Sequence, residues 1–145
     1  MPKLPTPRLL KKKYPVDEFR SCDVLILGEE IPKNNQRIKF PDTYVKRPEK
    51  IGSNGTHSIQ FFEENGIKCA HFVSLYVPKE ERKKGYGKAL VEHAINLARE
   101  RGVKLLRTNT TNHNDTKPIR TILFSQGFEI ANRQGEHKLT LEKKL

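Results

Sequence analysis

The stretch VPKEERKKGYGKAL, residues 77–90, places two glycines one residue apart, Gly85 and Gly87, inside a cluster of basic side chains. The apolar run KCAHFVSLYV leads into it, and apolar residues recur at helical spacing from Leu90 to Ala98 after it. Repeated glycine between a strand and a helix indicates a backbone that adopts positive φ or closely approaches another group. We therefore predict a glycine-containing loop between a strand and an amphipathic helix.

This loop has the features of a phosphate-binding site. Successive backbone N–H groups and the positive end of a helix dipole together favour an anion. Four basic side chains accompany them: Arg82, Lys83, Lys84 and Lys88. The dinucleotide fingerprint GxGxxG/A fails because its last position is Leu90, and the triphosphate pattern GxxxxGK[ST] is absent. The loop therefore favours a diphosphate, although the lysines also fit an ordinary solvated helix start.

The rest of the chain alternates between strand and helix patterns. Strands are predicted at DVLILG (23–28), more weakly at QRIKF (36–40), in HSIQFF and KCAHFVSLYV around the turn EENG, and at VKLLRTNTT (103–111). Residues 41–48 are a predicted loop, and FEIAN and HKLTLEK form a predicted closing hairpin. Helices are predicted at 88–101, ending at Gly102, and from Asn114 or Asp115 to Gly127, with Pro118 in the first turn. A strand, helix and strand in succession favour a parallel, right-handed crossover.

The segment RKKGYG resembles the acetyl-coenzyme A signature [QR]xxGxG/A of the GCN5-related N-acetyltransferase (GNAT) superfamily, with Arg82, Gly85 and Gly87 at its defined positions. The resemblance covers about residues 57–132 and includes the closing "GF" of the second helix. It implies a mixed α/β fold with a central mixed sheet, helices on both faces and parallel strands that splay at the cofactor site. It also implies transfer of an acetyl group from acetyl-CoA to an amine.

The resemblance further implies roles for individual residues. Leu75, Tyr76 and Val77 would lend backbone groups to the pantetheine arm, while the side chains of Leu75 and Val77 pack in the core. The diphosphate would be held by residues 82–88: Arg82, Lys83, Lys84, Gly85, Tyr86, Gly87 and Lys88. A backbone N–H near Val77 would polarise the thioester carbonyl.

His71 is the candidate general base. Some histone-modifying members of the family carry a glutamate six residues before the valine that ends this strand, and His71 occupies that position here. An imidazole with an ordinary pKa near ~6.5 suits proton abstraction. Strand alternation places His71 on the face of Val73, Leu75 and Val77, so a half-buried structural histidine is the alternative.

Two positions depart from the family pattern. Leu123 stands where many members have a tyrosine that protonates the leaving thiolate, and Thr116 replaces the asparagine that begins the same helix. Leucine cannot donate a proton, and Ser125 lies roughly 200° around the helix from it. The alternative function is therefore a catalytically weak or inactive GNAT-fold module that binds CoA or nucleic acid.

Charge also indicates an anionic partner. The chain has 28 Lys and Arg against 17 Asp and Glu, a net charge of +11. Nucleic acid bound through the run Lys11 to Lys13 stays open, although no aromatic pattern typical of RNA recognition accompanies it. The acceptor is a protein lysine, a protein N-terminus, a polyamine or a small amine. A cationic one would need a local acidic pocket, for which the candidates are Glu63, Glu64 and Glu136.

The length of 145 residues fits one domain, which we expect at 21–145 behind a basic, proline-containing arm at 1–20. No segment has the apolar length of a secretion signal or membrane span, so we expect a cytoplasmic protein, or a nuclear one in a eukaryote. Cys22 and Cys69 are expected to be free thiols. The histidines show no metal-ligand spacing, and Asn109, Asn112 and Asn114 are expected in turns and caps unless they meet the substrate.

Overall fold

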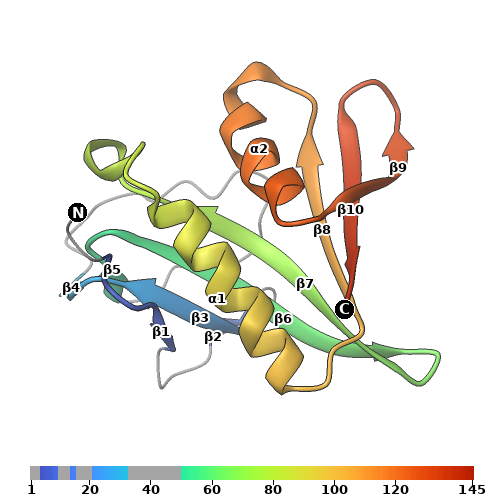
Figure 1. Ribbon diagram of the computed structural model, residues 1–145, viewed down its shortest axis with the longest axis horizontal. Helices are drawn as coiled ribbons and strands as arrows, with labels where there is room; N and C mark the ends of the chain where they lie inside the picture. Colours follow the sequence, from blue (N-terminus) through green and yellow to red (C-terminus); the bar gives the residue numbers. More distant parts are fainter. Residues whose placement is uncertain (1–3, 10–13, 16–20, 33–49) are drawn as a thin grey trace.

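The computed structural model describes residues 4–9, 14–15, 21–32 and 50–145, which form a mixed α/β architecture. An eight-stranded sheet has the order β1-β3-β6-β7-β8-β10-β9, and β2 also pairs with β3 (Figure 1). Its strands are β1 (Arg8–Leu9), β2 (Tyr14–Pro15), β3 (Ser21–Leu27), β6 (Gly55–Glu64), β7 (Ile67–Tyr76), β8 (Leu105–Thr111), β9 (Glu129–Gln134) and β10 (Lys138–Lys144). A second sheet contains β4 (Glu30–Pro32) and β5 (Lys50–Gly52), and the helices are α1 (Tyr86–Glu100) and α2 (Lys117–Ser125).

The two predicted hairpins are confirmed. β6 and β7 pair antiparallel up to Glu64 and Ile67, and the two residues between them, Asn65 and Gly66, have φ of 54° and 78°. Positive φ at both positions is the type I′ turn, whose twist matches that of the strands. β9 and β10 form the closing hairpin, and β10 also pairs antiparallel with β8.

The parallel pairing of the predicted crossover is also confirmed, because β7 and β8, which precede and follow α1 in the sequence, pair in parallel. α1 ends as expected at Gly102, where φ is 76° and the Val103 N–H donates to the Ala98 carbonyl at 3.0 Å. α2 ends in the same way at Gly127, and the Phe128 N–H donates to the Leu123 carbonyl at 3.1 Å. Both ends are Schellman motifs, which satisfy the last helical carbonyls.

One hydrophobic cluster joins both described helices to the sheet. From α1 it contains Leu90, Val91, Ala94, Ile95 and Ala98. Leu123 of α2 and Phe128 also belong to it, together with apolar residues of β3, β6, β7, β8 and β10. Each fully buried Leu or Val side chain stabilises the fold by roughly 1.5–3 kcal/mol. We expected helices on both faces, and the helices among the described residues cover one face.

Several predictions fall wholly or partly outside the described residues. They are the strand at 36–40, the loop at 41–48 and the basic run Lys11 to Lys13. In the predicted arm, β1 and β2 both pair antiparallel with β3. Cys69 is a free, buried thiol. Among the described residues, no helix has the length and apolarity to cross a membrane, and no cluster of side chains is suited to a metal ion.

Candidate functional site

The parallel strands β7 and β8 separate halfway along their length. They pair from Cys69 and Leu105 to Phe72 and Thr108, and beyond that rung no pair joins the described residues of the two strands. Each strand instead stays with its outer neighbour, β7 with β6 and β8 with β10, as far as Tyr76 and Thr111. Figure 1 shows the two strands diverging. The expected splay of the parallel pair is therefore present.

A β-bulge in β7 begins directly after the last paired rung. Ile59 of β6 pairs with Phe72 and Ser58 pairs with Ser74, so Val73 is an extra residue in β7. The bulge shifts the alternation of side chains by one position. Leu75 and Val77 consequently pack against the core that also contains Phe72, as their predicted structural role requires.

The bulge also corrects the predicted orientation of His71. Its strand partners are Gln60 and Arg107, whereas the neighbouring Phe72 belongs to the buried cluster under α1. His71 is therefore half-buried on the opposite face of the sheet from Leu75 and Val77. The expectation that these three residues share a face was wrong, because strict alternation fails across an inserted residue.

The loop before α1 presents a run of backbone donors. Arg82 has extended backbone angles, and Lys83 and Gly85 have positive φ of 66° and 88°. Among the described residues, no acceptor takes a hydrogen bond from the backbone N–H groups of residues 83–88. The first turn of α1 contains neither a capping side chain nor an acidic residue. A series of N–H groups at the positive end of a helix dipole is suited to binding an anion.

The two glycines of this loop are required for different reasons. Gly85 adopts the left-handed conformation as the residue before α1, and an added Cβ would meet only Leu4 Cδ1, at an ordinary 3.6 Å. Gly87 is helical and buried, and a Cβ there would lie 3.1 Å from Ile122 Cδ1 of α2. Gly85 therefore provides the turn, and Gly87 lets the first turn of α1 pack closely against α2.

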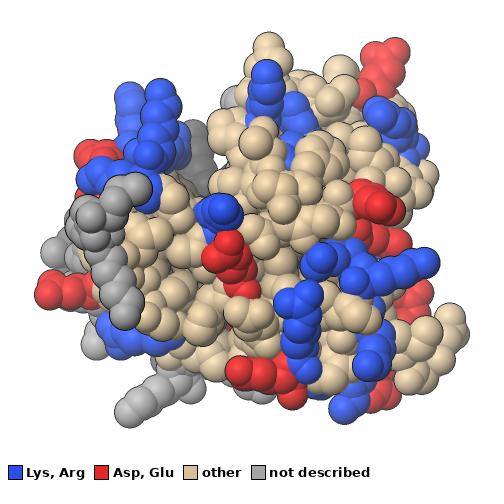
Figure 2. Space-filling view, in the orientation of Figure 1, with Lys and Arg blue, Asp and Glu red and all other residues tan. Residues whose placement is uncertain are grey.

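Basic side chains surround the loop, as Figure 2 shows at the end of the molecule where α1 begins. Arg82 Nε donates to the Val77 carbonyl at 3.1 Å, which ties the loop to the end of β7. Lys84 Nζ lies 3.2 Å from Glu81 Oε2, and Lys88 Nζ lies 4.0 Å from Glu92. The lysines remain exposed, so their charges face solvent beside the unbonded N–H groups.

The loop between β8 and α2 is built in the opposite way. Arg120 Nη1 donates to the carbonyls of Thr111 and His113 at 2.7 and 2.8 Å and to the Thr116 hydroxyl at 2.5 Å. The Thr116 hydroxyl also donates to these two carbonyls, at 3.0 Å each. Sequence reasoning identified Thr116 only as a departure from the family pattern and missed Arg120. Its distance of four residues from Thr116, one helical turn, was the available signal.

Leu123 offers no chemistry to the site. Its side chain is 3% exposed and belongs to the hydrophobic cluster. The Ser125 hydroxyl donates to the Ile122 carbonyl at 2.6 Å, so it is engaged within its own helix. In the region where the family pattern has a tyrosine, these two side chains therefore supply no proton donor to the splay.

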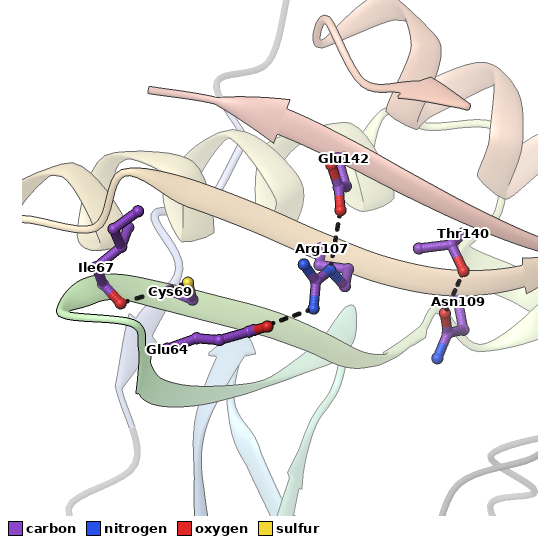
Figure 3. Close-up of polar contacts among 7 residues, drawn as sticks. All are labelled: Glu64, Ile67, Cys69, Arg107, Asn109, Thr140 and Glu142. Atoms are coloured by element: carbon purple, nitrogen blue, oxygen red, sulfur yellow. Dashed lines mark hydrogen bonds and ion pairs between the residues drawn. The ribbon is translucent and has the colours of Figure 1, made fainter. Parts of the chain in front are cut away.

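The face of the sheet that carries His71 is polar (Figure 3). Arg107 Nε donates to Glu142 at 3.0 Å, and its Nη1 donates to Glu64 at 3.4 Å. Burial acts to lower the pKa of Arg107, but hydrogen bonds and charge interactions with Glu142 and Glu64 raise it above its usual value. Of the predicted acidic residues, Glu64 is thus placed here, beside Glu142. Glu136 lies in the β9–β10 turn, 3.9 Å from His137.

Comparisons with known proteins identify the family and the fold. A family model described as the acetyltransferase (GNAT) family matches residues 43–120, more than half of the 145 residues. Among curated proteins, no sequence match was found. The structure resembles the NatC complex bound to Gag peptide and CoA, with a TM-score of 0.64 and 16% identity over 84% of this chain and 70% of that one.

Two further solved structures share the fold. An acetyltransferase from Bacillus subtilis in complex with CoA has a TM-score of 0.59 and 18% identity, over 88% of this chain and 78% of that chain. Naa50 from Arabidopsis thaliana, in complex with the bisubstrate analogue CoA-Ac-MVNAL, has a TM-score of 0.54 and 16% identity. That match covers 63% of this chain and 66% of the other. At these identities the similarity shows a common fold.

Proposed function

Because the chain belongs to the GNAT family of acetyltransferases, we propose that it transfers an acetyl group from acetyl-CoA to an amine acceptor. One observation carries the proposal. The consecutive N–H groups of residues 83–88, without acceptors among the described residues, lie at the start of α1, directly after the strand that parts from β8. Such a group of donors favours a ligand with a diphosphate.

The cofactor would lie along the splay with its diphosphate at the loop. The N–H groups of residues 83–88 bind the diphosphate oxygens, and the exposed Lys83, Lys84 and Lys88 add positive charge. The backbone groups of Leu75, Tyr76 and Val77 on the strand edge toward β8 would bind the pantetheine arm. Arg82 supports this arrangement through its bond to the Val77 carbonyl. Acetyl-CoA supplies the acetyl thioester.

His71 is the proposed general base. It lies on the face opposite α1, one rung before the strands part, so an amine reaching the splay from that face would meet its imidazole. The amine nitrogen attacks the thioester carbonyl, and His71 accepts the proton that the amine loses. The carbon–sulfur bond would break, and the thiolate would take a proton from water or from a nearby hydroxyl, since Leu123 is buried and has none to give.

Incubation with acetyl-CoA and a panel of acceptors tests the proposal. The panel contains peptides with free N-termini, peptides with an internal lysine, polyamines and small amines, and the readouts are thiol release and the mass of the product. A His71→Ala variant should lose at least tenfold in kcat while keeping its affinity for CoA. His93→Ala, on helix α1, is the matched control and should behave as the wild type. Equal rates in all three proteins would remove His71 as the base.

The runner-up function is a module of the same fold that binds CoA or nucleic acid without catalysis, and buried Leu123 favours it. CoA binding without turnover on any acceptor would support this alternative, and turnover on one specific acceptor would eliminate it. Nucleic-acid binding by the basic surface would fall steeply between low and moderate salt, because bound counterions are released. Acetyl transfer to a small neutral amine would not show that dependence.

A further inference from the structure

Thr108 bonds the two parallel strands together at the rung where they part. Its hydroxyl donates to the Phe72 carbonyl across the β7–β8 boundary at 2.9 Å. Phe72 and Thr108 are the last paired residues of these strands, and the bulge at Val73 follows at once. The Thr108 side chain is 7% exposed, so solvent competes little for this hydrogen bond.

The Phe72 side of this bond is also held firmly. The Phe72 ring makes an edge-on contact with His57 of β6, with ring centroids 4.7 Å apart. On its other side it meets Phe128, the residue that follows the α2 terminus, at 5.7 Å. Phe72 is thus fixed by side chains of β6 and of the α2 end, and Thr108 links β8 to that fixed point.

Beyond this rung, the outer partners draw the two strands apart. β7 follows β6 to Tyr76, and β8 follows β10 to Thr111. The pairing of β7 and β8 is weakest at its last rung, Phe72 and Thr108. Loss of that rung would move the point of separation toward the start of β7. A side-chain hydrogen bond at the last rung resists that opening at one defined position.

We infer that Thr108 is a positioning residue whose hydroxyl fixes the point at which β7 and β8 separate, and with it the depth at which the acetyl end of acetyl-CoA is held. The inference rests on the proposed function, because it requires the cofactor to lie in the splay. His71 lies one rung below Phe72, so a shift of the separation point would also change the distance between the base and the thioester.

Two pairs of variants isolate the hydroxyl. Thr108→Val keeps the shape and removes the hydroxyl, whereas Thr108→Ser keeps the hydroxyl. Thr108→Ala and Thr108→Ser differ only by the hydroxyl, so this second pair is available if the valine variant does not fold. Thr56→Val is the matched control, because Thr56 is also buried and its hydroxyl has no partner among the described residues.

We expect Thr108→Val to raise the KM for acetyl-CoA and weaken CoA binding about tenfold, since one buried hydrogen bond is lost at the rung where the strands part. Thr108→Ser and Thr56→Val should stay within about twofold of the wild type. Amide hydrogen exchange should accelerate in Thr108→Val at residues 72–74 and 108–110 and nowhere else. A merely structural loss would accelerate exchange throughout the sheet.

Three results would overturn the inference: unchanged CoA affinity in Thr108→Val, equal defects in Thr108→Ser and Thr108→Ala, or equal defects in Thr108→Val and Thr56→Val. Failure of the proposed function is distinguishable from these, because the wild type itself would then bind no CoA. In that event the exchange experiment decides alone. Equal exchange rates at residues 72–74 and 108–110 in all variants would then show that the Thr108 hydroxyl does not fix the point of separation.

Discussion

Two loops follow the diverging ends of β7 and β8, and each leads from a strand into a helix. In the loop before α1, the backbone N–H groups of residues 83–88 meet no acceptor among the described residues. In the loop before α2, Arg120 and Thr116 bond the Thr111 and His113 carbonyls. The first loop keeps its donors available for a ligand, whereas the second uses its polar groups to hold its own shape.

This difference indicates separate roles for two segments with the same topology. A loop whose polar groups are bonded internally contributes stability, because breaking those bonds leaves partly buried acceptors such as the Thr111 carbonyl unsatisfied. A loop with unbonded donors contributes binding free energy, which appears only when a ligand arrives. Substitutions should therefore affect stability in the α2 loop and affinity in the α1 loop.

The largest effect should come from His57, whose ring contacts Phe72 at the rung where β7 and β8 part. Burial lowers the pKa of His57 to about 4 against an ordinary 6.5, and a hydrogen bond with the Leu90 backbone offsets this only in part. Above about pH 6.5 the imidazole is neutral in both states. As pH falls toward 4, only the unfolded state takes up the proton, so about 3 kcal/mol of stability is lost.

Urea unfolding at several pH values measures this dependence. A His57→Phe variant keeps a ring against Phe72 and removes the titration, so its free energy of unfolding should change less between pH 6.5 and 4. The carboxylates titrate in both proteins and cancel in the difference. Identical pH profiles would contradict the assignment of a neutral, buried His57.

The next largest effect should separate the two loops. Arg120→Met removes a guanidinium that bonds three oxygens of the α2 loop, which should cost about 2 kcal/mol of stability. Urea denaturation gives the free energy, and calorimetry gives the affinity for CoA. Arg120→Lys keeps the charge without the planar donor group and should recover less than half of the loss. A loss below about 0.5 kcal/mol in Arg120→Met would show that the network is not structural.

Charge removal in the α1 loop should give the converse result. The triple variant Lys83→Gln, Lys84→Gln, Lys88→Gln should bind CoA roughly tenfold more weakly at low salt, with stability unchanged, because these exposed charges interact with phosphates through solvent. The matched control is Lys68→Gln, Lys104→Gln, Lys144→Gln, which alters the same net charge at exposed positions away from the loop. Equal losses in both triples would attribute the effect to net charge and break the comparison.

The smallest effect concerns the shape of the α1 loop. Gly85→Ala and Gly66→Ala each force alanine into positive φ, at 88° and 78°, and should cost about 1 kcal/mol of stability apiece. Only Gly85→Ala should also weaken CoA binding, because Gly66 lies in the β6–β7 turn. Titration calorimetry on both variants checks this, and equal affinities would show that the Gly85 conformation does not matter for the ligand.

The glycine spacing around Gly85 and the periodicity of the following helix were sufficient to predict the glycine loop and the crossover, and the strand patterns with their turn residues predicted both hairpins. The sequence contains no local signal for the bulge at Val73, because bulges depend on how a strand registers with its neighbour. That single residue reversed the predicted face of His71. Thr108 and Arg120 were missed for a similar reason, since their partners are fixed by tertiary contacts across a strand boundary and a turn.

The most direct test of the central claim is an NMR titration of the wild-type protein with coenzyme A, following the backbone amide shifts. We predict that the largest changes in amide proton shift occur at residues 83–88, several times those at residues 111–120. Saturable CoA binding with residues 83–88 unshifted would contradict it, because the diphosphate would then be bound by other groups.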